Sequence, residues 1–177
     1  MTTYIAFLRG INVTGHKIIK MEELRKMFEG IGFKNVRTYI QSGNVKFDTG
    51  NIKSEELTKK IESKLKNVFG YDVIVVTRTE KEIEEIIKGY PFSKVKDHDK
   101  CRIHVAFLSG EPGRNEVKEL ISFNTYSEMY NHKGANTYIL LRGGMADSLT
   151  GKNIIEKKLK VRATIRNWNT VNKMLTV

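Results

Sequence analysis

The stretches Ile5-Ala-Phe-Leu-Arg-Gly10 and Val105-Ala-Phe-Leu-Ser-Gly110 decide the fold. Each belongs to an apolar run, Tyr4 to Leu8 or Ile103 to Leu108, which is typical of a buried strand. Gly10 and Gly110, two residues after the ends of these runs, each lie in the loop that follows. The second stretch is similar in sequence to the first, so we expect two related halves.

The first strand opens an alternation of strands and helices. Apolar side chains at helical spacing predict a helix from Met21 to about Ile31, and a second from Ser54 to about Val68. Alternating residues on either side of the turn at Ser42-Gly43 predict a hairpin. The run Val73 to Val76 predicts another strand. The resulting order, βαββαβ, is that of the ferredoxin-like plait.

The pattern restarts after a helix with a capping box from Thr79 to Glu82, which ends near Gly89-Tyr90-Pro91. A strand at 103–108, a helix around 117–121, a hairpin at 126–141 and a helix at 154–159 follow, and an extra helix begins at about Asn167. We therefore predict an α+β fold, with two ferredoxin-like (alpha-beta plait) halves and a C-terminal helix. The predicted ranges are 1–92 for the N-terminal half, 93–101 for a polar linker and 102–177 for the C-terminal half.

The runs Tyr4 to Leu8 and Val73 to Val76 are apolar on both faces of their strands. Strands of this kind occur in sheets that are buried on both sides. Because the helices of a plait cover only one face, we expect the other half, the last helix or another subunit to cover the second.

The composition excludes several classes of protein. An apolar fraction of 40% across 177 residues supports a packed core and excludes a disordered basic tail. No apolar run reaches the roughly 20 residues of a membrane helix, and no signal peptide is visible. The single cysteine, Cys101, forms no internal disulfide and favours a reducing compartment. We expect a cytoplasmic protein with no membrane partner.

The net charge of +11 lies mostly at the two ends of the chain. Residues 1–50 carry 8 basic and 4 acidic side chains, and residues 151–177 carry 7 and 1. Such clusters of one sign attract phosphate, nucleotides, nucleic acid or an acidic partner. The alternative is ordinary solubility charge.

Three motifs suggest chemistry, and each lacks part of its pattern. The stretch Gly10-Ile-Asn-Val-Thr-Gly-His-Lys17 resembles a phosphate loop, but its lysine comes one place late and no Ser or Thr follows. His98-x-x-Cys101-x-x-His104 has no second cluster to complete a metal site, so we predict no metal. Ser42 has no histidine placed to activate it, and a turn explains it well. No pattern indicates a cofactor.

The predicted sheet surface does not match that of an RNA-binding plait. RNA-recognition plaits expose aromatic residues on their central strands, whereas the corresponding stretch Ser42-Gly-Asn-Val-Lys-Phe47 has one aromatic residue. Binding of nucleic acid through the sheet is therefore disfavoured, and binding through the basic C-terminal segment stays an alternative.

Three separated stretches together resemble signature motifs of the domain-of-unknown-function 1697 family. They are Ala6-Phe-Leu-Arg-Gly-Ile-Asn-Val13, Thr38-Tyr-Ile-Gln-Ser-Gly-Asn-Val45 and Ala163-Thr-Ile-Arg-Asn-Trp-Asn-Thr-Val171. Thr14 and Lys46 depart from the family, which usually has a glycine and an apolar residue there. The resemblance implies a small bacterial protein with two ferredoxin-like halves, and it implies no known activity.

The three stretches are rich in Arg, Asn, Ser and Thr at strand ends or a helix start, which favours binding of a small anionic or phosphorylated ligand in a cleft between the halves. The expected ligand-binding residues are Arg9, Asn12, Ser42, Asn44, Arg166, Asn167 and Asn169. No general acid, base or nucleophile stands out, so the sequence names no reaction and no catalytic residue. The alternatives are a nucleic-acid-binding module and a structural or protein-interaction role in which these residues brace the two halves.

Overall fold

The computed structural model describes all residues, 1–177, and its contacts divide the chain into two units. The first unit contains Met1–Ile86 and Asn172–Val177, and the second contains Ile87–Val171. The predicted linker at 93–101 contains a short 3-10 helix, His98–Lys100. None of the helices is long and apolar enough to cross a membrane.

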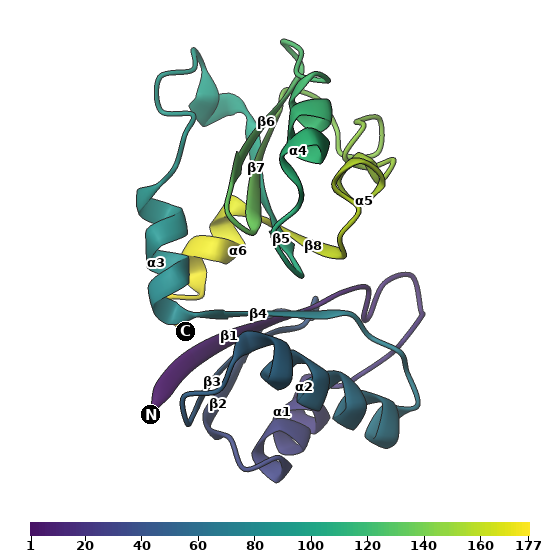
Figure 1. The fold of residues 1–177 in the computed structure, drawn as a ribbon. Coiled ribbons are helices and arrows are strands. Elements are labelled where there is room, and N and C mark those ends of the chain that lie inside the picture. The colour runs from purple at the N-terminus through teal and green to yellow at the C-terminus, as the bar shows by residue number, and fades with distance from the viewer. The chain divides into compact units, whose positions relative to one another are not determined.

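The first unit is a four-stranded antiparallel sheet of order β2-β3-β1-β4. Helices α1 and α2 lie on one face of this sheet (Figure 1). Their buried side chains, among them Leu24 and Ile61, pack against Tyr4, Ala6 and Leu8 of β1. The elements are β1 (Thr2–Leu8), α1 (Met21–Gly30), β2 (Lys34–Tyr39), β3 (Asn44–Thr49), α2 (Ser54–Phe69), β4 (Val75–Thr79) and α3 (Glu80–Lys88).

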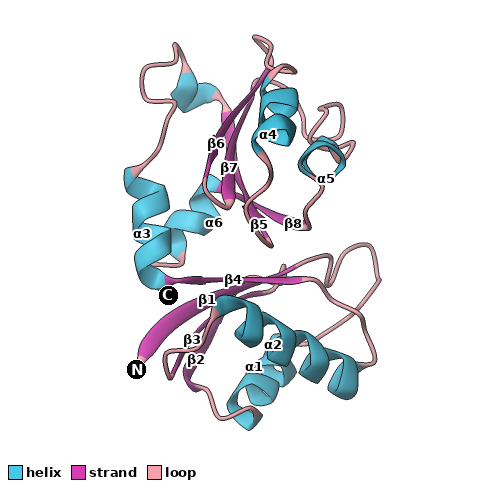
Figure 2. Ribbon diagram, viewed as in Figure 1, coloured by secondary structure: helices cyan, strands magenta, loops and turns pink.

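The second unit has a sheet of the same topology, with the order β6-β7-β5-β8. Helices α4 and α5 lie on one face of it (Figure 2). Its core includes Ala106 and Leu108 of β5 together with Leu120 and Ile155 from the two helices. The elements are β5 (Arg102–Leu108), α4 (Arg114–Ile121), β6 (Glu128–Lys133), β7 (Asn136–Leu141), α5 (Ile154–Leu159), β8 (Ala163–Asn167) and α6 (Trp168–Lys173).

The prediction of an α+β fold with two repeated halves and a C-terminal helix is therefore confirmed. Strand β8 is an addition, because the sequence analysis predicted no strand between α5 and the last helix. The stretch Ala163-Thr-Ile-Arg-Asn167 is short and mostly polar on one side, and at the edge of its sheet it lacks the apolar run that marks the inner strands. Asn167 then caps α6, since its Oδ1 accepts a 2.8 Å hydrogen bond from the Thr170 N–H.

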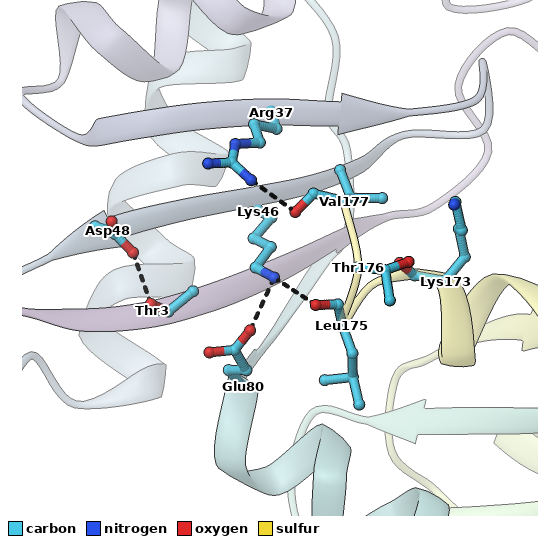
Figure 3. A network of polar contacts seen from close by, with 9 residues as sticks. All are labelled: Thr3, Arg37, Lys46, Asp48, Glu80, Lys173, Leu175, Thr176 and Val177. Atoms are coloured by element: carbon cyan, nitrogen blue, oxygen red, sulfur yellow. Dashed lines mark hydrogen bonds and ion pairs between the residues drawn. The ribbon is translucent and has the colours of Figure 1, made fainter.

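The second face of the first sheet is buried along β1 and β4, as the apolar runs of these strands predicted. Ile5, Phe7 and Val76 lie on that face, away from α1 and α2, and are at most 2% exposed. The chain's last residues lie over part of this face (Figure 3). Lys46 Nζ donates to the Leu175 carbonyl at 3.1 Å and Arg37 Nη1 donates to that of Val177 at 3.0 Å.

Candidate functional site

The second unit contains a cavity of about 580 Å³, which is within the range of small-molecule sites. It lies where the start of β5 meets the end of β8, because these strands pair antiparallel with His104 opposite Asn167. Helix α6 begins at the next residue, so Trp168 and Asn169 reach the same place. The lining residues are Tyr90, His98, Asp99, Cys101, Arg102, Ile103, His104, Asn167, Trp168 and Asn169.

Several polar side chains of this cavity have groups that no protein atom engages. The Arg102 guanidinium and the Asn169 amide make no hydrogen bond or ion pair, and both residues are exposed. Asn167 uses its Oδ1 to cap α6, which leaves its two amide hydrogens without a protein acceptor. A guanidinium and amide N–H groups together are suited to holding a carboxylate or a phosphate.

The aromatic wall of the cavity consists of Tyr90, His98 and Trp168. The ring centroids of Tyr90 and Trp168 are 5.0 Å apart, and those of Tyr90 and His98 are 5.8 Å apart. The Tyr90 hydroxyl and His98 Nδ1 share a hydrogen bond of 3.1 Å. Burial raises the pKa of Tyr90, with a smaller contribution from Cys101, so the phenol stays protonated at neutral pH.

His104 adds a neutral imidazole to the cavity. Its Nδ1 atom is buried and has no hydrogen-bond partner. Burial lowers the pKa of His104 below its ordinary value, because the imidazolium would lose its hydration there. Arg102, whose guanidinium is always charged, supplies the fixed positive charge that the cavity offers to a ligand.

The metal motif considered from the sequence does not come together. Nowhere do three or more His, Cys, Asp or Glu side chains stand close enough to hold a metal ion. The Cys101 thiol instead donates to the carbonyl of Asp97 at 3.3 Å. The spacing of His98, Cys101 and His104 arises from a 3-10 turn that leads into a strand.

The seven predicted ligand-binding residues divide between the two units. Asn167 and Asn169 line the cavity described above. Arg166 lies on the other face of the second sheet, since it pairs with Val105 whereas Asn167 pairs with His104. Its Nη1 donates to Thr164 Oγ1 at 2.9 Å and to the Ile165 carbonyl at 3.0 Å, and burial lowers its pKa to about 10.

The remaining predicted residues belong to the first unit. Asn12 Nδ2 donates to the carbonyls of Ile19 and Gln41, each at 2.9 Å, so both of its amide hydrogens hold the loop that follows β1. The Asn44 amide, fully buried, donates to the Tyr39 carbonyl and to Ser42 Oγ. Arg9 follows β1, and its N–H donates to the Ile74 carbonyl at 2.9 Å. These bonds give Asn12 and Asn44 a bracing role, and a single cleft lined by all seven residues stays a prediction.

The sequence analysis missed Arg102, Tyr90 and Asp99. Arg102 stands at the start of a strand and Asp99 in a polar linker, where charged residues usually face solvent without a function. Tyr90 follows a helix end, which explained it as part of a turn. The pairing of β5 with β8 brings Arg102 to the cavity, whereas Tyr90 reaches it through its ring contact with Trp168 and Asp99 through the 3-10 helix before β5.

The comparisons with known proteins identify the family and leave the activity open. Across its whole length the fold resembles the conserved bacterial protein SP0830 from Streptococcus pneumoniae, at 22% sequence identity and a TM-score of 0.77. The match covers 99% of this chain and 97% of that protein. No curated protein matches the sequence. Residues 1–138 match the family described as "Protein of unknown function (DUF1697)", and the chain belongs to that family.

Proposed function

We propose that this protein binds a small anionic ligand and that the cavity of the second unit holds the ligand's anionic group. One observation carries the proposal: Arg102, Asn167 and Asn169 surround the same cavity with donor groups that no protein atom uses. Charge-assisted hydrogen bonds from an arginine are the strong ones in such sites, and amides fix the orientation.

The proposal concerns binding and names no reaction. The cavity's sulfur and one of its histidines are already engaged, since Cys101 donates to Asp97 and His98 bonds with Tyr90. We therefore propose a ligand-binding protein, and a cytosolic location forms part of the proposal. Contributions of Arg9, Asn12, Ser42, Asn44 and Arg166 to the ligand stay predictions.

Binding of nucleic acid through the basic C-terminal segment is less well supported. Lys158 Nζ lies 2.6 Å from Glu119 and Lys160 Nζ lies 3.9 Å from Glu116. Arg166 of the same segment is largely buried in the second sheet. These pairings reduce the one-sign charge that would hold a phosphate backbone.

The proposal is tested by calorimetric titration of the full chain with inorganic phosphate, citrate and ribose 5-phosphate. We expect at least one of them to bind, and we expect Arg102→Gln to weaken that binding by about ten-fold or more. Arg114→Gln is the matched control, because Arg114 is an exposed arginine of α4 in the same unit and lies outside the cavity. If none of the three anions binds at about 10 mM, or if both variants bind equally well, the proposal is wrong.

A further inference from the structure

The cavity of the second unit has a preformed aromatic surface beside its cationic group. Trp168 contacts two tyrosine rings, with centroid distances of 5.0 Å to Tyr90 and 6.5 Å to Tyr138. Trp168 and Tyr90 remain only half-buried although they line the cavity. Their exposed surfaces therefore meet whatever occupies it. Flat aromatic rings stack on such side chains, and this contact is selective for ring compounds over aliphatic ones.

The charges of the cavity are one arginine and one aspartate. Arg102 and Asp99 both line it, and neither forms an ion pair with the other or with any further side chain. Arg102 can neutralise one anionic group. Asp99 disfavours a second anionic group in the cavity, since like charges repel each other. The arrangement thus selects for a ligand that has a single anionic group.

From these two observations we infer that the ligand is a flat aromatic or heteroaromatic ring that carries one anionic group. The ring would stack on Trp168 and Tyr90, and the anionic group would bind Arg102. The volume of about 580 Å³ accommodates a molecule of this size. This inference rests on the proposed function. Two sources supply such chemistry, a nucleoside monophosphate and an aromatic carboxylate.

Two pairs of probes distinguish the contribution of the ring to the affinity from that of the anionic group. The first pair is adenosine 5′-monophosphate and ribose 5-phosphate, and the second is benzoate and cyclohexanecarboxylate. Dissociation constants are measured by calorimetry with the full chain. We expect the aromatic member of at least one pair to bind about ten-fold more tightly than its partner, and the pair that shows this identifies the source.

The variants then assign the effect to the cavity. Trp168→Ala should reduce the preference for the ring to within about two-fold, whereas Trp168→Phe should retain most of it. Tyr126→Ala is the control for loss of an aromatic residue, because Tyr126 is exposed in the same unit and lies outside the cavity. Asp99→Asn should strengthen the binding of adenosine 5′-triphosphate relative to the monophosphate.

The outcomes distinguish this inference from the proposed function. If both members of each pair bind equally well, the inference is overturned and the proposed function stands. A preference for the ring that survives in Trp168→Ala also overturns the inference. If none of the four probes binds while phosphate or citrate does, the inference is overturned and the proposed function stands; if phosphate and citrate also fail to bind, both are overturned.

Discussion

Arg78 and Arg166 occupy the same position in the two sheets. Arg78 lies on β4 opposite Ile5 of β1, and Arg166 lies on β8 opposite Val105 of β5. Each donates from Nη1 to the carbonyl of the residue before it, at 2.8 Å for Arg78 and 3.0 Å for Arg166. Burial lowers the pKa of both guanidinium groups. The two sheets therefore share more than the similar apolar sequences of β1 and β5, because each edge strand also has a buried arginine at the same position.

Replacing either arginine by lysine should destabilise the protein. A lysine keeps the charge but cannot reproduce the fork of donors that a buried guanidinium offers, so we expect Arg78→Lys and Arg166→Lys each to lower the free energy of unfolding by about 1–2 kcal/mol. Urea denaturation measures this effect. Arg114→Lys, at an exposed position, should change the stability by less than about 0.5 kcal/mol. Equal stabilities for all three variants would show that the buried fork has no structural role.

Gly43 cannot be replaced without strain. Its φ is +81°, and a Cβ there would lie 2.7 Å from Ile11 Cδ1 and 2.8 Å from Leu8 Cβ. We expect Gly43→Ala to lower the free energy of unfolding by about 2–4 kcal/mol, through backbone strain and overpacking together. Gly50→Ala is the control, because a Cβ at Gly50 meets nothing within 4 Å. A Gly43→Ala variant that melts with the parent protein would contradict the described turn.

Lys46 couples α3 to the C-terminal residues. Its side chain is 12% exposed and lies 2.8 Å from Glu80 while it also donates to the Leu175 carbonyl. A double-mutant cycle of Lys46→Met and Glu80→Gln should give a coupling energy of about 1 kcal/mol, since the Lys46 side chain is largely shielded from water although that of Glu80 is 36% exposed. The same cycle at Lys59 and Glu55, an exposed pair at 2.8 Å, should show no measurable coupling. Similar coupling energies for the two pairs would show that burial of the Lys46 side chain does not strengthen its ion pair.

A buried carboxylate makes the stability of the second unit depend on pH. Glu128 accepts hydrogen bonds from the N–H groups of Leu149 and Thr150, at 2.9 and 2.8 Å, and from the hydroxyls of Tyr130 and Thr150. Burial alone would raise the pKa of Glu128, but these hydrogen bonds together hold it below its ordinary value. The ionised carboxylate therefore stabilises the fold above the unfolded-state pKa, and this contribution is lost as the pH falls through the folded-state pKa.

Accordingly, Glu128→Gln should lower the free energy of unfolding at pH 7 by about 2 kcal/mol, because the amide cannot accept all of these hydrogen bonds. The difference between the variant and the parent protein should shrink as the pH falls below about 4. Denaturation at a series of pH values measures it. Asp147→Asn is the control, because Asp147 is an exposed acid in the loop whose Leu149 and Thr150 N–H groups bind Glu128. A difference that stays constant with pH would exclude the ionised state of Glu128 as its cause.

Much of the fold could be predicted from the sequence, because apolar periodicity reports burial directly. Helix α2 illustrates both the strength and the limit of that signal. The spacing of Leu57, Ile61 and Leu65 correctly predicts the buried stripe, whereas Val68 fits the same spacing and is 50% exposed. Phe69, four residues after Leu65, packs against the core in place of Val68, so the buried stripe continues at Phe69. Apolar residues stand at both helical spacings after Leu65, and periodicity alone does not show which of the two faces the sheet.

The candidate site was only partly predictable, because it depends on strand pairing. Asn167 and Asn169 were predicted from an unusual local cluster of polar residues, and both line the cavity. Arg102 and Tyr90 reach that cavity from separate parts of the chain, and no local pattern distinguishes them from ordinary surface and turn residues. The register of β5 with β8 sets His104 opposite Asn167 and so places Arg102 nearby, and Tyr90 joins the site through its ring contact with Trp168.

The most direct test of anion binding uses the single tryptophan of the chain, Trp168. In an NMR spectrum the indole N–H of Trp168 gives one resonance. The position of that resonance reports on the cavity when the full chain is titrated with adenosine 5′-monophosphate and with benzoate. We predict a saturable shift of this resonance, which Arg102→Gln weakens by about ten-fold and Arg114→Gln leaves unchanged. An indole resonance that stays in place up to about 10 mM of both probes would contradict the account.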